Sequence, residues 1–144
     1  MIALPLRHKL ASKTRLRLSS LAAEPFVMYA PANGRAVYDA IIAACRRSGF
    51  SPRIVQEAPQ MSSTINWVAA GVGVTIVPES MSHLQTHLVV YKRIAGGAPR
   101  ATMSLAIRSG AVSPAIEKFV EEVDRVFGKK RSRAALAPVA LAQR

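Results

Sequence analysis

Short apolar segments alternate with segments of helical character along the middle of this chain, and this alternation constrains the fold more than any other feature. The segments FVMY (26–29), RIVQEA (53–58) and VTIV (74–77) have the length and composition of strands. The segment 35–48 places its apolar residues on one helical face, and a second helix is predicted from Pro59 to about Ala70. Strands that alternate with helices of this length form βαβ units, so the sequence predicts an α/β fold with a mainly parallel sheet.

The remaining predicted elements are three strands and three helices. Strands are predicted at 1–4, 87–91 and 102–108. Short helices are predicted at 19–23, where Ser19 can act as the cap, and at 78–84, which Pro78 opens. A longer helix is predicted at 113–127, and its apolar stripe consists of Ile116, Phe119, Val120, Val123 and Phe127.

The stretch VAAGVGVTIVP contains a Gly-Val-Gly sequence that invites comparison with a phosphate-binding loop. Such loops follow a strand and open a helix, because the anion binds the free N–H groups at the helix N-terminus. Here the glycines follow the helix that ends at Ala70 and precede the strand at Val74, so that helix end presents carbonyl groups. Gly71 is therefore predicted to cap the helix in the left-handed conformation, and Gly73 to let the chain turn tightly into the sheet.

The sequence contains no group of residues that indicates catalysis, a metal site or a cofactor. His8, His83 and His87 lack the spacing of metal ligands, and Cys45 lies on the apolar face of the helix at 35–48. The sequence has no G-x-S-x-G nucleophile elbow, and its single cysteine cannot form an internal disulfide. We therefore expect a protein that is not an enzyme and that binds neither a metal nor a cofactor.

The formal net charge of +12 arises mainly from the two ends of the chain. Basic residues cluster between Arg7 and Arg17 and again between Lys129 and Arg144. Aromatic residues make up 6% of the chain and are not interleaved with these clusters, as a base-stacking surface requires. A solvated surface with a basic tail is the favoured interpretation, and a polyanion-binding protein that acts through its charged ends is an alternative.

The sequence also bears on where the protein resides. Its apolar runs are shorter than the roughly 20 residues of a membrane span. The first ten residues, MIALPLRHKL, place the basic residues after the apolar ones, which is not the order of a signal peptide. We expect a cytoplasmic protein without membrane contact.

Two predicted helix N-termini each follow a predicted strand, and they are the best candidates for a binding site. They are the loop PANGR (31–35) and the segment PQMSS (59–63). In open α/β sheets, ligands bind beyond the carboxyl ends of the strands, where such helix ends converge. The free N–H groups, together with Asn33, Arg35, Ser62 and Ser63, suit a small carboxylate. An equally weighted alternative is that Asn33 and Ser62 only cap their own helices.

Several segments together resemble the co-inducer-binding domain of LysR-type transcriptional regulators. They are RHKLAS, EPFVMYAP, CRRSGFSPRIVQEAPQMSSTINWVAAGVGVTIVPESM and LVVYKRI, within a match from about Ile2 to Phe127. The helix–Gly–strand–Pro stretch VAAGVGVTIVP is the most specific part, whereas Lys9 departs from the proline that usually follows the histidine. The resemblance implies a type 2 periplasmic-binding-protein-like fold that holds an effector in a cleft between two lobes.

The resemblance further implies a domain organisation. Residues 1–112 correspond to lobe two, 113–128 to a C-terminal helix that belongs to lobe one, and 129–144 to a disordered basic tail. The chain would then contain one complete Rossmann-like lobe and a small part of the second, without the winged helix-turn-helix. The apolar stripe of the helix at 113–127 would lack its usual partner, so we expect it to be exposed, docked elsewhere or used in self-association.

The resemblance also implies site residues and partners. The effector contacts of lobe two would fall on Ala32, Asn33, Gly34, Arg35 and Val37 and on Gln60, Met61 and Ser62. The expected partners are a small organic effector, which we expect to be a carboxylate, and a second copy of the intact protein through the helix at 35–48. DNA would be bound only through a winged helix-turn-helix that this sequence does not contain. A fragment of a solute-binding protein with the same fold is the closest alternative.

Overall fold

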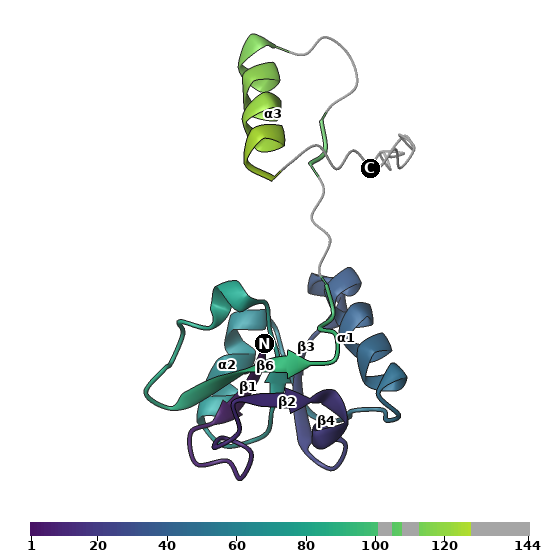
Figure 1. Cartoon of the computed structure of the whole chain (residues 1–144), viewed down its shortest axis with the longest axis vertical. Helices are drawn as coiled ribbons and strands as arrows, with labels where there is room; N and C mark the ends of the chain where they lie inside the picture. The colour runs from purple at the N-terminus through teal and green to yellow at the C-terminus, as the bar shows by residue number, and fades with distance from the viewer. Residues whose placement is uncertain (101–104, 108–112, 128–144) are drawn as a thin grey trace. The chain divides into compact units, whose positions relative to one another are not determined.

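The structure is a computed structural model of the chain, and it describes residues 1–100, 105–107 and 113–127. The chain divides into two compact units, Met1–Met103 and Ser104–Arg144. The first unit contains the sheets and two of the helices, and the described part of the second unit is mainly one helix (Figure 1). The assignment of these units to lobes stays a prediction.

Within residues 1–100, the first unit has six strands, two α-helices and three 3-10 turns. The strands are β1 (Ile2–Pro5), β2 (Arg15–Arg17), β3 (Pro25–Tyr29), β4 (Arg53–Ala58), β5 (Thr75–Ile76) and β6 (Val89–Ala95). The helices are α1 (Arg35–Arg47) and α2 (Met61–Ala69), and the 3-10 turns are η1 (Leu18–Leu21), η2 (Pro31–Asn33) and η3 (Glu79–Met81). The predicted strands at 26–29 and 53–58 and the predicted helix at 35–48 are confirmed to within one residue at each end.

The strands form a four-stranded sheet in the order β2-β6-β1-β5 and a parallel pair, β3-β4. A parallel bridge between Phe26 and Val74 connects them, with hydrogen bonds from Val74 N to Pro25 O (2.8 Å) and from Val27 N to Val74 O (2.9 Å). The prediction of a mainly parallel sheet is wrong for the centre of the four-stranded sheet, because β1 runs antiparallel to both β5 and β6. Among the described residues, the parallel ladders are β2-β6 and β3-β4.

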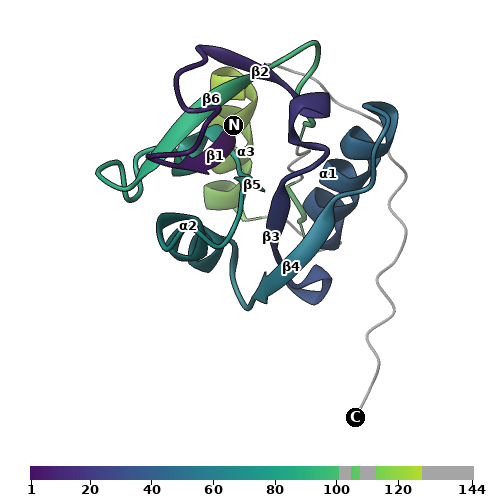
Figure 2. The ribbon, with the colours of Figure 1, turned by 90° about the horizontal axis from the view of Figure 1, so that it is seen from below.

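Both faces of the sheet are buried, as the alternation along β1 demonstrates. Ile2 and Leu4 belong to one hydrophobic cluster and Ala3 to another, because successive side chains of a strand point to opposite faces. All three residues are fully buried. A helical layer on each face of the sheet provides this burial (Figure 2).

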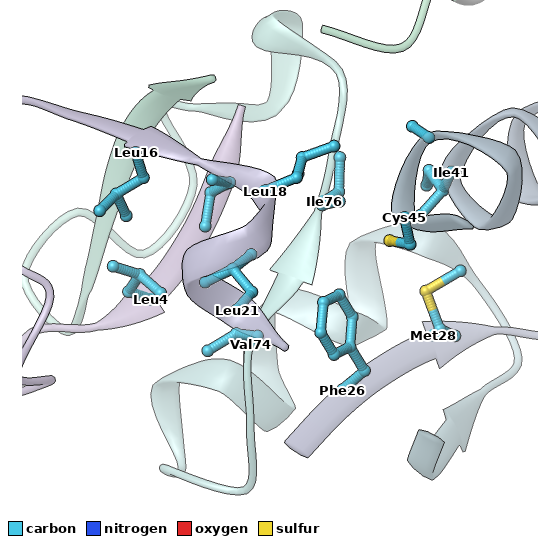
Figure 3. Close-up of a cluster of buried hydrophobic side chains, with 12 residues drawn as sticks. Leu4, Leu16, Leu18, Leu21, Phe26, Met28, Ile41, Cys45, Val74 and Ile76 are labelled. Carbon is cyan, nitrogen blue, oxygen red and sulfur yellow. The ribbon is translucent and has the colours of Figure 1, made fainter. Parts of the chain in front are cut away.

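The larger cluster, here called the α1 core, lies between α1 and the sheet. Figure 3 shows Ile41 and Cys45 of α1 directed toward Met28 and Phe26 of β3, with Leu18 and Leu21 of η1 beside them. Its buried members are Ile2, Leu4, Leu16, Leu18, Leu21, Phe26, Met28, Ile41, Ala44, Cys45, Val74 and Ile76. The prediction that Cys45 is a buried apolar residue is confirmed.

The smaller cluster, here called the α2 core, lies on the opposite face. Its buried members are Ala3, Ile65, Val68, Val77 and Val89, and Met61 packs against them. Thr64 is also fully buried in α2, and its hydroxyl donates to the carbonyl of Met61 at 2.6 Å. The buried hydroxyl is therefore satisfied within the first turn of the helix.

The two glycines that follow α2 have different roles. Gly71 has φ +79°, and the hydrogen bonds from Gly71 N to Val68 O (2.9 Å) and from Val72 N to Trp67 O (3.1 Å) form a Schellman motif. The predicted left-handed cap is confirmed. Gly73 is buried, and a Cβ atom at this position would lie 2.5 Å from the carbonyl oxygen of Pro25. Glycine is required there because β5 approaches the backbone of β3 closely.

Three predicted boundaries near helices are wrong. Pro59 does not open α2, which begins at Met61 with Gln60 as the cap, because a hydrogen bond from Ala30 N to Ala58 O continues the β3-β4 pairing to this point. Ser19 lies inside η1 and is not its cap, because Arg17 in β2 occupies that position. The helix predicted at 78–84 is limited to η3.

Two strand predictions also differ from the structure. β6 begins at Val89 rather than at 87, because the chain is still turning there: the N–H groups of Leu88 and Val89 both donate to the carbonyl of Gln85 at 2.9 Å. β2 lies in a segment for which no strand was predicted, and its Leu16 is buried between the exposed Arg15 and Arg17. Of the strand predicted at 102–108, residues 105–107 are not in a strand and the others lie outside the described residues.

The second unit contains α3 (Pro114–Phe127), which begins after Ser113 as predicted. No residue of α3 is buried, and Phe119 and Phe127 are 57% and 79% exposed. The described residues of this unit therefore do not cover the apolar stripe. The predicted basic tail at 129–144 lies outside the described residues. Within the described ranges, no helix is long and apolar enough to cross a membrane.

The buried carboxylate of Glu24 connects η1 to the turn after β1. Lys9 Nζ lies 2.8 Å from Glu24 Oε1, and His8 Nε2 lies 3.3 Å from Glu24 Oε2. The N–H of Leu10 donates to His8 Nδ1, so the neutral ring carries its proton on Nε2 and donates it to Glu24. Burial raises the pKa of Glu24, but the hydrogen bonds from Lys9 and His8 outweigh it and hold the pKa below its ordinary value of 4.5.

We expect Glu24→Gln to lower the free energy of unfolding by about 1–2 kcal/mol at pH 7, since charge-assisted hydrogen bonds are lost. A carboxylate with a lowered pKa stabilises the fold above its unfolded-state pKa, and this contribution disappears as the pH falls through the folded-state value. Urea unfolding from pH 7 to pH 3 measures the effect, with the exposed Glu57→Gln as the control. A Glu24→Gln difference that stays constant over this range would contradict the interpretation.

We expect Gly73→Ala to destabilise the first unit by about 2–3 kcal/mol, because the backbone oxygen of Pro25 cannot rotate away from the added methyl group. Gly71→Ala is the matched control, because it meets no atom within 4 Å and is affected only by its positive φ. Its expected cost is about 1 kcal/mol. Urea unfolding of both variants compares them, and a smaller loss in Gly73→Ala than in Gly71→Ala would contradict this account.

Candidate functional site

The carboxyl ends of β3 and β4 lie side by side, and both predicted site segments begin there. Tyr29 pairs with Ala58 at the end of the parallel ladder, and Ala30 N donates to Ala58 O at 3.0 Å. The loop that leads to α1 and the loop that leads to α2 therefore leave the same edge of the sheet. This edge is where open α/β sheets bind their ligands.

Gly34 organises the first of these loops. Its carbonyl accepts hydrogen bonds from Val37 N and Tyr38 N, both at 3.1 Å, and from the hydroxyl of Tyr29 at 2.9 Å. A Cβ atom on Gly34 would lie 3.2 Å from the ring of Tyr29, so the ring and the loop are closely packed. Burial raises the pKa of Tyr29, which keeps its hydroxyl a neutral donor.

Gln60 and Met61 define the second loop. Gln60 is the cap of α2, and its carbonyl accepts a hydrogen bond from Ser63 N at 3.1 Å. Met61 is the first helical residue, and its half-buried side chain packs against the α2 core. Ser62 is exposed in the first turn.

The caps of the two helices are not the residues that the capping alternative requires. Gly34 and Gln60, rather than Asn33 and Ser62, occupy the N-cap positions, and neither cap makes a side-chain hydrogen bond. Neither first turn contains an acidic residue. The N–H groups of the first turns therefore face no competing carboxylate of their own helix, and the helix dipoles favour a bound anion.

The predicted site residues differ in exposure. Gly34, Val37 and Met61 are half-buried, and the exposed ones are Ala32, Arg35, Gln60 and Ser62. Asn33 is the last residue of η2. Val37 packs against the α1 core, so the two loops present apolar groups from both cores at the same edge.

A cavity of about 380 Å³ opens farther along this edge, and the sequence did not predict it. Val37 lines the cavity and is the residue that it shares with the predicted site. The other walls come from α1, from Met1, from the ends of β5 and β6 and from the chain that follows each of these two strands. These segments are far apart in the sequence, so no local pattern could have brought them together.

Three charged side chains line this cavity, and they belong to Glu79, Arg93 and Arg100. Glu79 Oε1 lies 3.1 Å from Arg93 Nη2, and the two form an exposed ion pair. Arg100 forms no ion pair with any residue that the structure describes. Arg100 is thus the cationic side chain beyond the internal pair, and the ammonium group of the lining residue Met1 donates to the carbonyl of Val77 at 2.7 Å.

Neither the loops nor the cavity contain the groups of an active site. Cys45 is fully buried, and burial raises the pKa of its thiol to about 11, so it is not a thiolate near neutral pH. Among the described residues, no group of three His, Cys, Asp or Glu side chains could hold a metal ion.

Known proteins with a similar sequence are transcriptional regulators. The chain is 34% identical over 119 residues to the HTH-type transcriptional regulator AlsR of Bacillus subtilis. The aligned region covers 83% of this chain and 39% of AlsR. The chain therefore spans about two fifths of the length of this relative.

Solved structures of such regulators share the fold. CbnR, a LysR family transcriptional regulator, matches with a TM-score of 0.74 at 24% identity, over 86% of this chain and 43% of CbnR. The effector binding domain of BenM with its effector benzoate matches with a TM-score of 0.70 at 18% identity, over 92% of this chain and 63% of that domain.

The sequence model of a protein family, the LysR substrate binding domain, matches residues 1–128, which is most of the chain. The relatives are regulators of transcription, and the chain is not an enzyme. The architecture agrees with this match, since the mixed α/β fold is that of LysR effector-binding domains. This chain belongs to the LysR substrate-binding domain family of transcriptional regulators.

Proposed function

We propose that this chain is lobe two of a LysR-type effector-binding domain, with a C-terminal helix of lobe one, and that it binds a small organic carboxylate. The observation that carries the proposal is the pair of helix N-termini at the carboxyl edge of β3 and β4. Neither helix has a side-chain cap or an acidic residue in its first turn. Arg35 adds a cationic side chain beside them.

The ligand class has support from a relative. The BenM domain binds benzoate as its effector, and benzoate is a carboxylate with an apolar ring. The half-buried Val37 and Met61 provide apolar surface next to the N–H groups, as such a ligand requires. The proposed contacts are Ala32, Asn33, Gly34, Arg35, Val37, Gln60, Met61 and Ser62.

The proposal extends to the whole protein. Effector binding would change the balance between two arrangements of its lobes, and so change how a separate helix-turn-helix engages DNA in the cytoplasm. The family match favours this function over a solute-binding protein of the same fold. Polyanion binding through the charged ends of the chain stays a prediction.

The test is a thermal-shift screen of the chain against small carboxylates, each paired with its neutral amide. We expect at least one acid to raise the melting temperature and its amide to leave it unchanged. Arg35→Gln and Met61→Ala should each weaken binding of that acid about tenfold, the loss that one charge-assisted or well-packed contact produces. Arg53→Gln is the matched control, because Arg53 is exposed at the opposite end of β4. An unchanged melting temperature across the whole panel would contradict the proposal.

In the intact protein, α1 is also proposed to contact a second copy. Its outer face carries the half-buried Tyr38 and Ile42 and the exposed Arg46 and Arg47, around a hollow at the surface. Arg46→Glu is expected to lower self-association without changing the melting temperature, and Arg53→Glu to leave both unchanged. Sedimentation velocity measures the association, and an equal mass for wild type and Arg46→Glu at every concentration would contradict this assignment.

A further inference from the structure

Three arginine side chains gather on one face of the four-stranded sheet, where β2 forms its edge beside β6 (Figure 2). Leu16 of β2 and Ile94 of β6 are paired in the parallel register, and both pack in the α1 core. Because successive side chains of a strand point to opposite faces, Arg15, Arg17 and Arg93 project from the other face of the sheet. These three residues are here called the arginine face.

The arginine face is open to solvent. All three of its residues are exposed. The helix on this side of the sheet, α2, packs mainly on β3 and β1. Tyr91 of β6 lies on the same face but belongs to the covered part, since it packs against the α2 core and its hydroxyl donates to the carbonyl of Leu84 at 2.6 Å. The α2 layer therefore leaves the β2 end of the sheet to the arginines.

Positive charge exceeds negative charge on the arginine face. Glu79 Oε1 lies 3.1 Å from Arg93 Nη2, and both side chains are about two thirds exposed (69% and 66%), so water screens the pair. Arg15 and Arg17 form no ion pair with any residue that the structure describes. The other acidic residues of the first 100 lie after η1, on α1 and on β4, and they are Glu24, Asp39 and Glu57.

The chemistry of the arginine face favours one class of polyanion. A guanidinium group can donate two parallel hydrogen bonds to a phosphate. The apolar neighbours Leu16 and Ile94 are turned into the α1 core, so they are not available to enter a membrane, and the ring of Tyr91 is not free to stack on an unpaired base. Since the curated relatives are HTH-type regulators of transcription, double-stranded DNA is the polyanion expected beside the intact protein.

We infer that the arginine face contacts the phosphate backbone of double-stranded DNA without reading its sequence. Arg15 and Arg17 each bind a phosphate group, and Arg93 does so in competition with Glu79. Such contacts add affinity and orient a protein on the duplex, whereas sequence is read elsewhere, through contacts to the base edges. The inference goes beyond the proposed function and is independent of it, because neither of the two effector loops takes part.

The probe is a fluorescently labelled DNA duplex of about 20 base pairs, and anisotropy measures its binding to the full chain from about 50 to 200 mM NaCl. We expect Arg15→Gln and Arg17→Gln each to weaken binding about fivefold, and the double variant to lower the slope of log K against log salt by about 2. Arg53→Gln is the matched control, because Arg53 is an exposed strand arginine at the start of β4, and it should leave the slope unchanged. A duplex of unrelated sequence should bind equally well.

Glu79→Gln tests the sign of the effect. Loss of this carboxylate frees Arg93 for a phosphate and removes a like charge, so the duplex should bind about threefold more tightly. Glu57→Gln removes the same charge from an exposed position on β4 and should leave binding unchanged. Melting curves of each variant verify that the fold is retained.

Four results would overturn the inference. The first is a wild-type chain that does not bind the duplex at about 50 mM salt. The second is a double variant that binds it as the wild type does, with the same salt slope. The third is a full chain with Lys129, Lys130, Arg131 and Arg133 all changed to Gln that loses binding completely, which would assign it to the basic tail. The fourth is a double variant that loses binding to anionic phospholipid vesicles but not to DNA, which would make a membrane surface the partner. None of these results affects the carboxylate screen, so the proposed function is tested separately.

Discussion

The contact between β3 and β5 is the constraint on which the rest of the first unit depends. Two backbone hydrogen bonds join Val74 to Pro25 and Val27, and they are the link between the β3-β4 pair and the four-stranded sheet. The strands approach so closely that Gly73 has no room for a side chain. Without this contact, the loops after β3 and β4 would not share an edge with the ends of β5 and β6.

The shared edge brings together the features that suit a ligand. Two helix N-termini without a side-chain cap follow the β3-β4 pair, and a cavity lies at the ends of β5 and β6, where Arg100 forms no ion pair with a described residue. Val37 belongs to both regions because it lies in the first turn of α1 and packs against the α1 core. An anion at this edge would meet helix dipoles and arginine side chains from several elements, and each supports the same charge preference.

The elements predicted well are those that local patterns determine. The helical face of 35–48 and the apolar run of 53–58 specify α1 and β4 nearly to the residue, and Gly71 marks the end of α2 by its left-handed conformation. The prediction of parallel pairing was wrong for β1. The direction of β1 depends on its pairing with β5 and β6, which lie more than 70 residues away along the chain. β2 was missed because only Leu16 in its three residues is apolar.

The candidate site also has one part that could be predicted from the sequence and one part that could not. The positions of the two loops followed from strand–helix order and from the family resemblance, and the structure places both at one sheet edge. The roles of Glu79, Arg93 and Arg100 could not be predicted, because their proximity arises from the pairing of β6 with β1 and from the path of the chain beyond it. Whether Ser62 caps α2 could also not be decided from the sequence, since the answer depends on the residue at which α2 begins.

Amide hydrogen exchange of the chain with and without a bound carboxylate tests the central claim, that the carboxyl edge of this sheet is the ligand surface. The account predicts slower exchange at 31–37, 60–63 and 93–100, with no change at 49–52 and 71–74, which lead into the opposite ends of β4 and β5. Protection confined to 49–52 and 71–74, or spread evenly over both edges, would contradict it.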